Sequence, residues 1–193
     1  MNVILGISIS HNGSVSLICD GEVKVAIQAE RISRFKRQSL FIDKNTELLK
    51  RCVQYCLQSS GLKYEDINAI AISTPWDLNK ISNDILFNSI GGTPNNYIGT
   101  FYVPHHLSHM EYILHYGERQ PGIVLVIDGS GSFEKDRSLF NIKEESHSQI
   151  INHTDLDGKE VISAYWFDGS KSYLIYKFSP SISPKAKCNR NAK

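Results

Sequence analysis

Short apolar runs separated by turn residues open the chain, and this pattern constrains its fold more than any other feature. Strands are expected at residues 3–9, 14–19 and 22–28. Asp20 and Gly21 separate the second strand from the third, and both residue types accept the positive φ that a type I′ turn demands. The connection at residues 10–13 (Ser-His-Asn-Gly) also consists of turn-forming residues. The chain is therefore predicted to begin with three strands, the last two of which form a hairpin.

Helical periodicity appears over residues 45–60, where apolar side chains recur every three to four positions and Gly61 follows as a stop. Cys52 and Cys56 lie on this apolar stripe and are interpreted as core residues. The apolar runs at 67–73 and 122–127 are typical of buried strands. A weak helical segment and a loop are expected within 76–99, and an extended segment at 101–103. Pro104 predicts a helix start, because proline is favoured in the first turn, and this helix should reach about Tyr116.

Two more strands, at residues 161–167 and 172–178, flank Asp168-Gly169 and predict a second hairpin. The order of strand, turn and hairpin thus occurs twice, from Val3 and again from Gly122. Two α/β halves that face each other across a cleft are the expected result, with the second half cut short. The predicted boundaries are 1–120 for the first half-domain, 121–178 for the beginning of the second, and 179–193 for a disordered polar tail.

The composition excludes several functions. Lys and Arg number 21 against 20 Asp and Glu, a formal charge of +1 over 193 residues, so no overall basic field exists to hold nucleic acid. The four cysteines form no CxxC pair, which argues against a zinc ribbon or a disulfide framework and favours a reducing compartment. No apolar run approaches the roughly 20 residues that span a bilayer, and the start lacks the features of a signal peptide. We expect a cytoplasmic protein with neither nucleic acid nor membrane as a partner.

A candidate metal site lies in the segment Val-Pro-His-His-Leu-Ser-His at residues 103–109. His105 and His109 are four residues apart, so on a helix they point the same way and can place two imidazole nitrogens on one ion. Asp128, at the end of a predicted strand, is a plausible third ligand. Nitrogen and carboxylate ligands suit iron, zinc or manganese better than calcium. The alternative is a surface helix with chance histidines, and His106, turned about 100° away, is interpreted as such a surface residue.

Two loops and a basic segment offer further candidates. Gly129, Ser130 and Gly131 follow Asp128, and small residues let backbone N–H groups approach a phosphate closely, although a flexible turn is an equal alternative. His11 occupies the matching turn of the first half, where it could act as a base or be an exposed histidine without a role. The segment 30–37 (ERISRFKR) carries four positive charges, which indicates a solvated face or a contact to a phosphate or acyl phosphate.

Four segments together resemble the N-terminal part of the carbamoyltransferases of the nodulation and antibiotic-tailoring type. They are residues 4–14 (ILGISISHNGS), 28–36 (QAERISRFK), 105–109 (HHLSH) and 126–131 (VIDGSG). Their common order and spacing make the resemblance specific; it runs to about Gly131 and loosely to Phe178. The first domain of that family is similar to the universal tRNA threonylcarbamoyl-transfer protein. The resemblance therefore implies an α/β, actin-like ATPase (ribonuclease H-like) fold, with one complete half and the start of the second.

The resemblance also implies a reaction and its residues. In such proteins a carbamoyl group from carbamoyl phosphate is activated with ATP as carbamoyl adenylate and then passed to a hydroxyl of a small-molecule acceptor. Carried over to this chain, His105, His109 and Asp128 would bind a divalent metal, with iron expected ahead of zinc or manganese. His11 would help to deprotonate the acceptor hydroxyl, and Lys36 would contact the carbamoyl or phosphate group. Gly129, Ser130 and Gly131 would contact the nucleotide.

Departures from the family pattern restrict what the chain is expected to do alone. Asn12 stands where the family usually has an aspartate after the first-turn histidine. The adenylate-forming domain has no counterpart in this sequence, so a missing C-terminal domain or a partner chain would have to supply it, and the isolated chain is expected not to run the full reaction. Two other interpretations stay open: a truncated, non-catalytic domain that binds or assembles, and a phosphotransferase related to sugar kinases on the same fold.

Overall fold

The computed structural model describes residues 1–41, 45–74, 83–92, 98–117, 119–129, 131 and 161–178. The chain divides into two compact units, Met1–His105 and His106–Lys193. Within the described ranges no helix is long and apolar enough to cross a membrane. The predictions for residues 75–82, 93–97 and the tail 179–193 lie outside the described residues, and the half-domain boundary at residue 120 stays a prediction.

A five-stranded sheet forms the first unit. Its strands are β1 (Val3–Ser8), β2 (Ser14–Cys19), β3 (Glu22–Gln28), β4 (Ala69–Ser73) and β5 (Gly99–Val103), in the order β3-β2-β1-β4-β5. The first three strands are antiparallel neighbours, whereas β4 and β5 run parallel to β1. Asp20 and Gly21 have φ angles of 50° and 88°, which confirms the predicted turn. This strand order is the ribonuclease H-like topology, so the α/β fold class and one actin-like half are confirmed.

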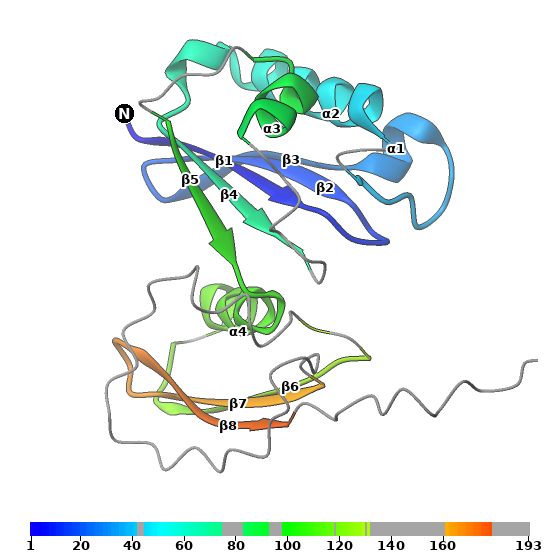
Figure 1. Cartoon of the computed structure of the whole chain (residues 1–193). Coiled ribbons are helices and arrows are strands. Elements are labelled where there is room, and N and C mark those ends of the chain that lie inside the picture. Colours follow the sequence, from blue (N-terminus) through cyan, green and yellow to red (C-terminus); the bar gives the residue numbers. More distant parts are fainter. Residues whose placement is uncertain are drawn as a thin grey trace, which may run out of the picture. The chain divides into compact units, whose positions relative to one another are not determined.

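Helices cover one face of this sheet (Figure 1). They are α1 (Ala29–Ser33), α2 (Thr46–Ser60) and α3 (Asn83–Ile90), with a 3-10 turn η1 (Tyr64–Asp66) after α2. The predicted apolar stripe of α2 is buried, including Cys52 and Cys56. Burial raises the pKa of the Cys52 thiol to about 11 and that of Cys56 to about 12, so both thiols stay protonated at neutral pH. Gly61 ends the helix with a φ of 69°, as the sequence predicts.

The second unit is a three-stranded antiparallel sheet with a helix on one face (Figure 1). Its elements are α4 (His105–Tyr116), β6 (Gly122–Ile127), β7 (Ile162–Phe167) and β8 (Ser172–Phe178), with β7 in the centre. The division between the units falls at the first residue of α4. Met110 and Leu114 of α4 pack with Val126, Tyr165 and Phe167 in a small apolar core. The predicted helix after Pro104 and the predicted second hairpin are both confirmed.

The prediction that β6 is buried is wrong for half of its residues. Ile123, Leu125 and Ile127 are 66%, 55% and 69% exposed, whereas Val126 between them is 5% exposed. Successive side chains of a strand point to opposite faces of the sheet, and α4 packs against only one of those faces. A continuous apolar run therefore does not distinguish a strand covered on both faces from one covered on a single face.

Candidate metal centre

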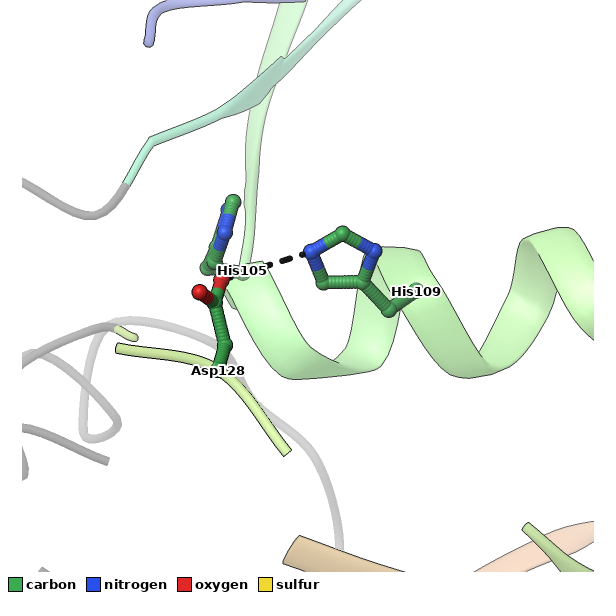
Figure 2. A group of neighbouring side chains, drawn as sticks. All are labelled: His105, His109 and Asp128. Atoms are coloured by element: carbon green, nitrogen blue, oxygen red, sulfur yellow. Dashed lines mark ion pairs between the residues drawn. The ribbon is translucent and has the colours of Figure 1, made fainter. Parts of the chain in front are cut away.

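Two histidines of the candidate site come from the first two turns of α4. Pro104 follows β5, and the helix begins at His105, with His109 one turn later. His105 is partly buried and the side chain of His109 is 50% exposed. Residues four apart lie on the same side of a helix, and Figure 2 shows both imidazole rings beside Asp128. The helix they share fixes the backbone positions from which these two rings extend.

Asp128 reaches the histidines from the end of β6. Its backbone N–H donates to the carbonyl of Val161 at 3.0 Å, which continues the β6–β7 ladder by one residue. The N–H of Gly129 donates to Oδ1 of Asp128 at 2.6 Å. The other carboxylate oxygen, Oδ2, lies 3.6 Å from Nε2 of His109 (Figure 2). One oxygen is thus held by the turn, and the other is directed at the helix.

The three side chains have the chemistry and the spacing to bind a divalent metal. Their ligand atoms all lie within 4.8 Å of one another. Two ligand atoms about 2.1 Å from a tetrahedral ion are about 3.4 Å apart. The 3.6 Å between Nε2 of His109 and Oδ2 of Asp128 fits that spacing. Two imidazoles and one carboxylate also leave coordination positions open. The predicted grouping of His105, His109 and Asp128 therefore exists in the structure.

His106 is not the surface histidine that the sequence suggests. Its side chain is 0% exposed, and its Nδ1 lies 2.8 Å from Oγ of Ser163 in β7, which is also fully buried. The two atoms share a hydrogen bond. The signal was present in the sequence, because His106, Met110 and Leu114 recur at a spacing of four, which is the apolar face of this helix. No sequence pattern points to Ser163 as the partner of His106, because the two residues are 57 positions apart in the chain.

His11 and Lys36 lie on two connected loops of the first unit. His11 is exposed in the turn between β1 and β2, and Lys36 is exposed in the turn after α1. The N–H of Gly13 donates to the carbonyl of Gln38 at 2.9 Å, which joins the two loops. A Cβ at Gly13 would lie 2.7 Å from the backbone nitrogen of Leu40, so only glycine permits this approach. The structure thus joins the two loops by their backbones, while the roles of His11 and Lys36 stay predictions.

The turn after Asp128 is only partly described. Gly129 is exposed, and a Cβ there would meet no atom within 4 Å, whereas Gly131 is buried. Ser130 lies outside the described residues. The predicted contacts of Gly129, Ser130 and Gly131 with a nucleotide stay predictions.

Comparison with known proteins gives a family match. Residues 3–101 match the family described as carbamoyltransferase N-terminus. The nodulation protein NolNO of Sinorhizobium fredii is 28% identical over 144 residues, which is 64% of this chain and 20% of that protein. An uncharacterized protein of Methanocaldococcus jannaschii is 30% identical over 164 residues, or 80% of this chain and 27% of that protein. The chain spans only about a fifth to a third of the length of the curated relatives it matches.

Two solved structures are similar at low identity. YeaZ from Pseudomonas aeruginosa has a TM-score of 0.47 at 13% identity, covering 91% of this chain and 68% of its own. A putative N-acetylglucosamine kinase from Porphyromonas gingivalis has a TM-score of 0.41 at 12% identity, covering 93% of this chain and 48% of its own. The strand order of the first unit, and not these likenesses, carries the fold assignment.

Proposed function

Since the chain belongs to the carbamoyltransferase family, we propose that it takes part in the metal-assisted transfer of a carbamoyl group to a hydroxyl of a small molecule. The observation that carries this proposal is the cluster of His105, His109 and Asp128, whose ligand atoms lie within 4.8 Å of one another. A transferase that moves an acyl-type group needs a way to stabilise the negative charge that develops on the carbonyl oxygen. This cluster is the part of the described chain best suited to that task.

Each residue of the cluster has a defined part in binding. Neutral His105 and His109 offer nitrogen lone pairs, and ionised Asp128 offers a negatively charged oxygen. The N–H of Gly129 holds Oδ1 of Asp128 at 2.6 Å and leaves Oδ2 toward His109. A bound divalent ion, with iron expected ahead of zinc or manganese, would supply Lewis-acid polarisation of the carbamoyl carbonyl. The half-exposed His109 leaves room for a substrate to reach the site.

The remaining residues act on the acceptor and on the leaving group. In the proposed transfer, the acceptor hydroxyl oxygen bonds to the carbamoyl carbon, the bond from that carbon to the adenylate phosphate oxygen breaks, and AMP leaves. His11 takes the hydroxyl proton, as a histidine can near neutral pH. Lys36 contacts the carbamoyl or phosphate group, and Gly129, Ser130 and Gly131 contact the nucleotide. The hydrogen bond between Gly13 and Gln38 supports this division of roles, because it joins the loops of His11 and Lys36.

Formation of the carbamoyl adenylate from carbamoyl phosphate and ATP is assigned to protein outside this chain. The chain spans only about a fifth to a third of its matched relatives, so a C-terminal domain or a partner chain is proposed to deliver the adenylate. With carbamoyl phosphate, ATP and an alcohol acceptor, this polypeptide alone is expected to form no carbamate product. Detection of that product by mass spectrometry would move adenylate formation into this chain.

Metal binding provides the direct test of the site. The purified chain is titrated with Zn²⁺ and Mn²⁺ by calorimetry and analysed for bound metal after exposure to Fe²⁺ without oxygen. One equivalent should bind, and His109→Ala should weaken binding by at least about tenfold, because a lost ligand costs more than the loss of a supporting contact. His115→Ala is the matched control, because His115 is an exposed histidine of the same helix outside the cluster. Equal binding by both variants would show that the cluster is not the metal site.

A further inference from the structure

The buried face of α4 carries one polar side chain among apolar ones. His106, Met110 and Leu114 are 0%, 0% and 5% exposed and recur every four residues. Met110 and Leu114 share a core with Val126, Tyr165 and Phe167 of the sheet, and His106 contacts Ser163 of β7. His105 and His109 precede His106 and Met110 by one residue each, so they lie about 100° further round the helix. The orientation of α4 about its own axis therefore has two results at once. It buries His106, and it directs His105 and His109 toward the end of β6.

One hydrogen bond fixes this helix to the sheet at a defined position. Nδ1 of His106 and Oγ of Ser163 are 2.8 Å apart, and both residues are 0% exposed. Apolar packing alone is not directional, so it permits small rotations and shifts of a helix on a sheet. A buried hydrogen bond specifies distance and direction, and breaking one is costly because a buried polar atom loses its partner.

Strand β7 connects this bond to Asp128. Ser163 pairs with Val126, two residues before Asp128, in the β6–β7 ladder. The carbonyl of Val161 accepts the backbone N–H of Asp128 at 3.0 Å. Val161, the residue before β7, thus holds the carboxylate strand, and Ser163 within β7 holds the histidine helix. A change at Ser163 acts on the relative placement of both sets of ligands without touching any ligand.

We propose that Ser163 is a positioning residue of the metal centre, which sets His105 and His109 opposite Asp128 through its hydrogen bond to His106. The role in metal binding rests on the proposed function, whereas the placement of the three side chains does not. The tolerance is narrow, because ligand atoms must lie within a few tenths of an ångström of their ideal distances from an ion. Removing the hydroxyl should therefore weaken metal binding although all three ligands remain.

The test compares Ser163→Ala with Leu114→Ala in the full chain. Leu114→Ala removes apolar packing from the same helix face at its other end and leaves the His106 bond in place, so it controls for lost stability. The probe is Co²⁺, whose visible absorption reports coordination geometry. Ser163→Ala should weaken Co²⁺ binding by roughly tenfold and alter the absorption bands, while the Co²⁺ affinity of Leu114→Ala should stay within about twofold of that of the unchanged protein.

Ser163→Thr keeps a hydroxyl and should restore most of the affinity. Wild-type affinity and bands in Ser163→Ala, or an equal loss in both alanine variants, would overturn the proposal.

A metal-independent measurement separates this inference from the proposed function. His109→Cys and Asp128→Cys are combined in a Cys188→Ser chain and treated with dibromobimane, which becomes fluorescent when it bridges two neighbouring thiols. Adding Ser163→Ala should slow bridging several-fold relative to adding Leu114→Ala. If the chain binds no metal but bridging slows in this way, the positioning role stands and the metal function fails. If bridging is unchanged, the positioning role fails whatever the metal result.

Discussion

The two sheets differ in the face that their helices leave uncovered. In the first unit, the central strands carry mostly small side chains on the face opposite α2, among them Gly6, Ser8, Ser16 and Ala71. In the second unit, the face opposite α4 carries large apolar side chains. These are Ile123, Leu125, Ile127, Trp166, Tyr176 and Phe178, between 39% and 69% exposed. The uncovered face of the first sheet therefore has mostly small side chains at its centre, with Phe101 exposed on the edge strand, whereas that of the second sheet is apolar across all three strands.

In the second unit, the buried apolar contacts lie on the face of the sheet that α4 covers. Among the described residues, five buried side chains form that core, compared with 20 in the core of the first unit. Few apolar contacts hold an element in place when a core is small. The polar side chains of His106, Ser163 and Lys177 lie on the same buried side. A hydrogen bond there therefore adds, and a desolvated charge subtracts, a larger fraction of the stability of this unit.

The largest effect is expected from Phe167→Ala. Phe167 is 1% exposed in the core beneath α4, and the guanidinium of Arg119 lies 5.6 Å from its ring centre. Truncating a buried phenylalanine costs about 3–5 kcal/mol. Hydrogen exchange should show faster exchange of the amides of β7 and β8, with little change in β1 and β2. Equal acceleration in β1 and β2 would mean that the two units unfold together and that their stabilities cannot be compared separately.

A smaller, pH-dependent effect is expected at Lys177. This side chain is 5% exposed, and burial lowers the pKa of its ammonium group from 10.5 to about 7. Between these values the unfolded chain binds more protons than the folded one, so stability rises as pH rises through this window. Below pH 7 both states are protonated and the penalty is complete.

Lys177→Met should therefore stabilise the second unit by on the order of 2–4 kcal/mol at pH 6. The gain should shrink as the pH rises to about 10. Urea unfolding followed at several pH values measures it, with Lys171→Met as the exposed control. A gain that does not vary with pH would refute burial of a charge as its cause.

The smallest effect is expected on the uncovered face. Leu125→Thr should change the free energy of unfolding by no more than about 0.5 kcal/mol, because Leu125 is 55% exposed. Val126→Thr places a hydroxyl in the buried core one residue later and should cost about 1–3 kcal/mol. Denaturant unfolding compares the two variants. Similar losses of unfolding free energy in the two variants would show that the outer face of the second sheet is covered in solution. The second unit would then have no exposed apolar face to set against the first.

Local sequence signals predicted most of the elements correctly. The stripe over residues 45–60 and the Asp20-Gly21 turn specify α2 and the β2–β3 hairpin through local geometry alone. The i, i+4 spacing of His105 and His109 likewise predicts two rings on one side of a helix. In each case the period of a helix or the φ of a turn decides the outcome over a few residues.

Long-range contacts explain what the sequence did not reveal. The uncovered face of β6 follows from the position of α4, and the partner of His106 is a serine 57 residues away. Asp128 follows β6 and is not part of α4, so its distance from His109 depends on how β6 and α4 pack. No local period encodes such contacts.

The sequence by itself determined the strand and helix order, the family and the types of side chain available to a metal. Only the tertiary structure decided which face of each sheet is covered, that His106 is buried on Ser163, and that Asp128 meets His109 at 3.6 Å. The physical reason is that secondary structure follows from steric and hydrogen-bonding preferences between near neighbours. A site, in contrast, requires side chains from distant segments to meet, and packing of the whole unit sets those distances.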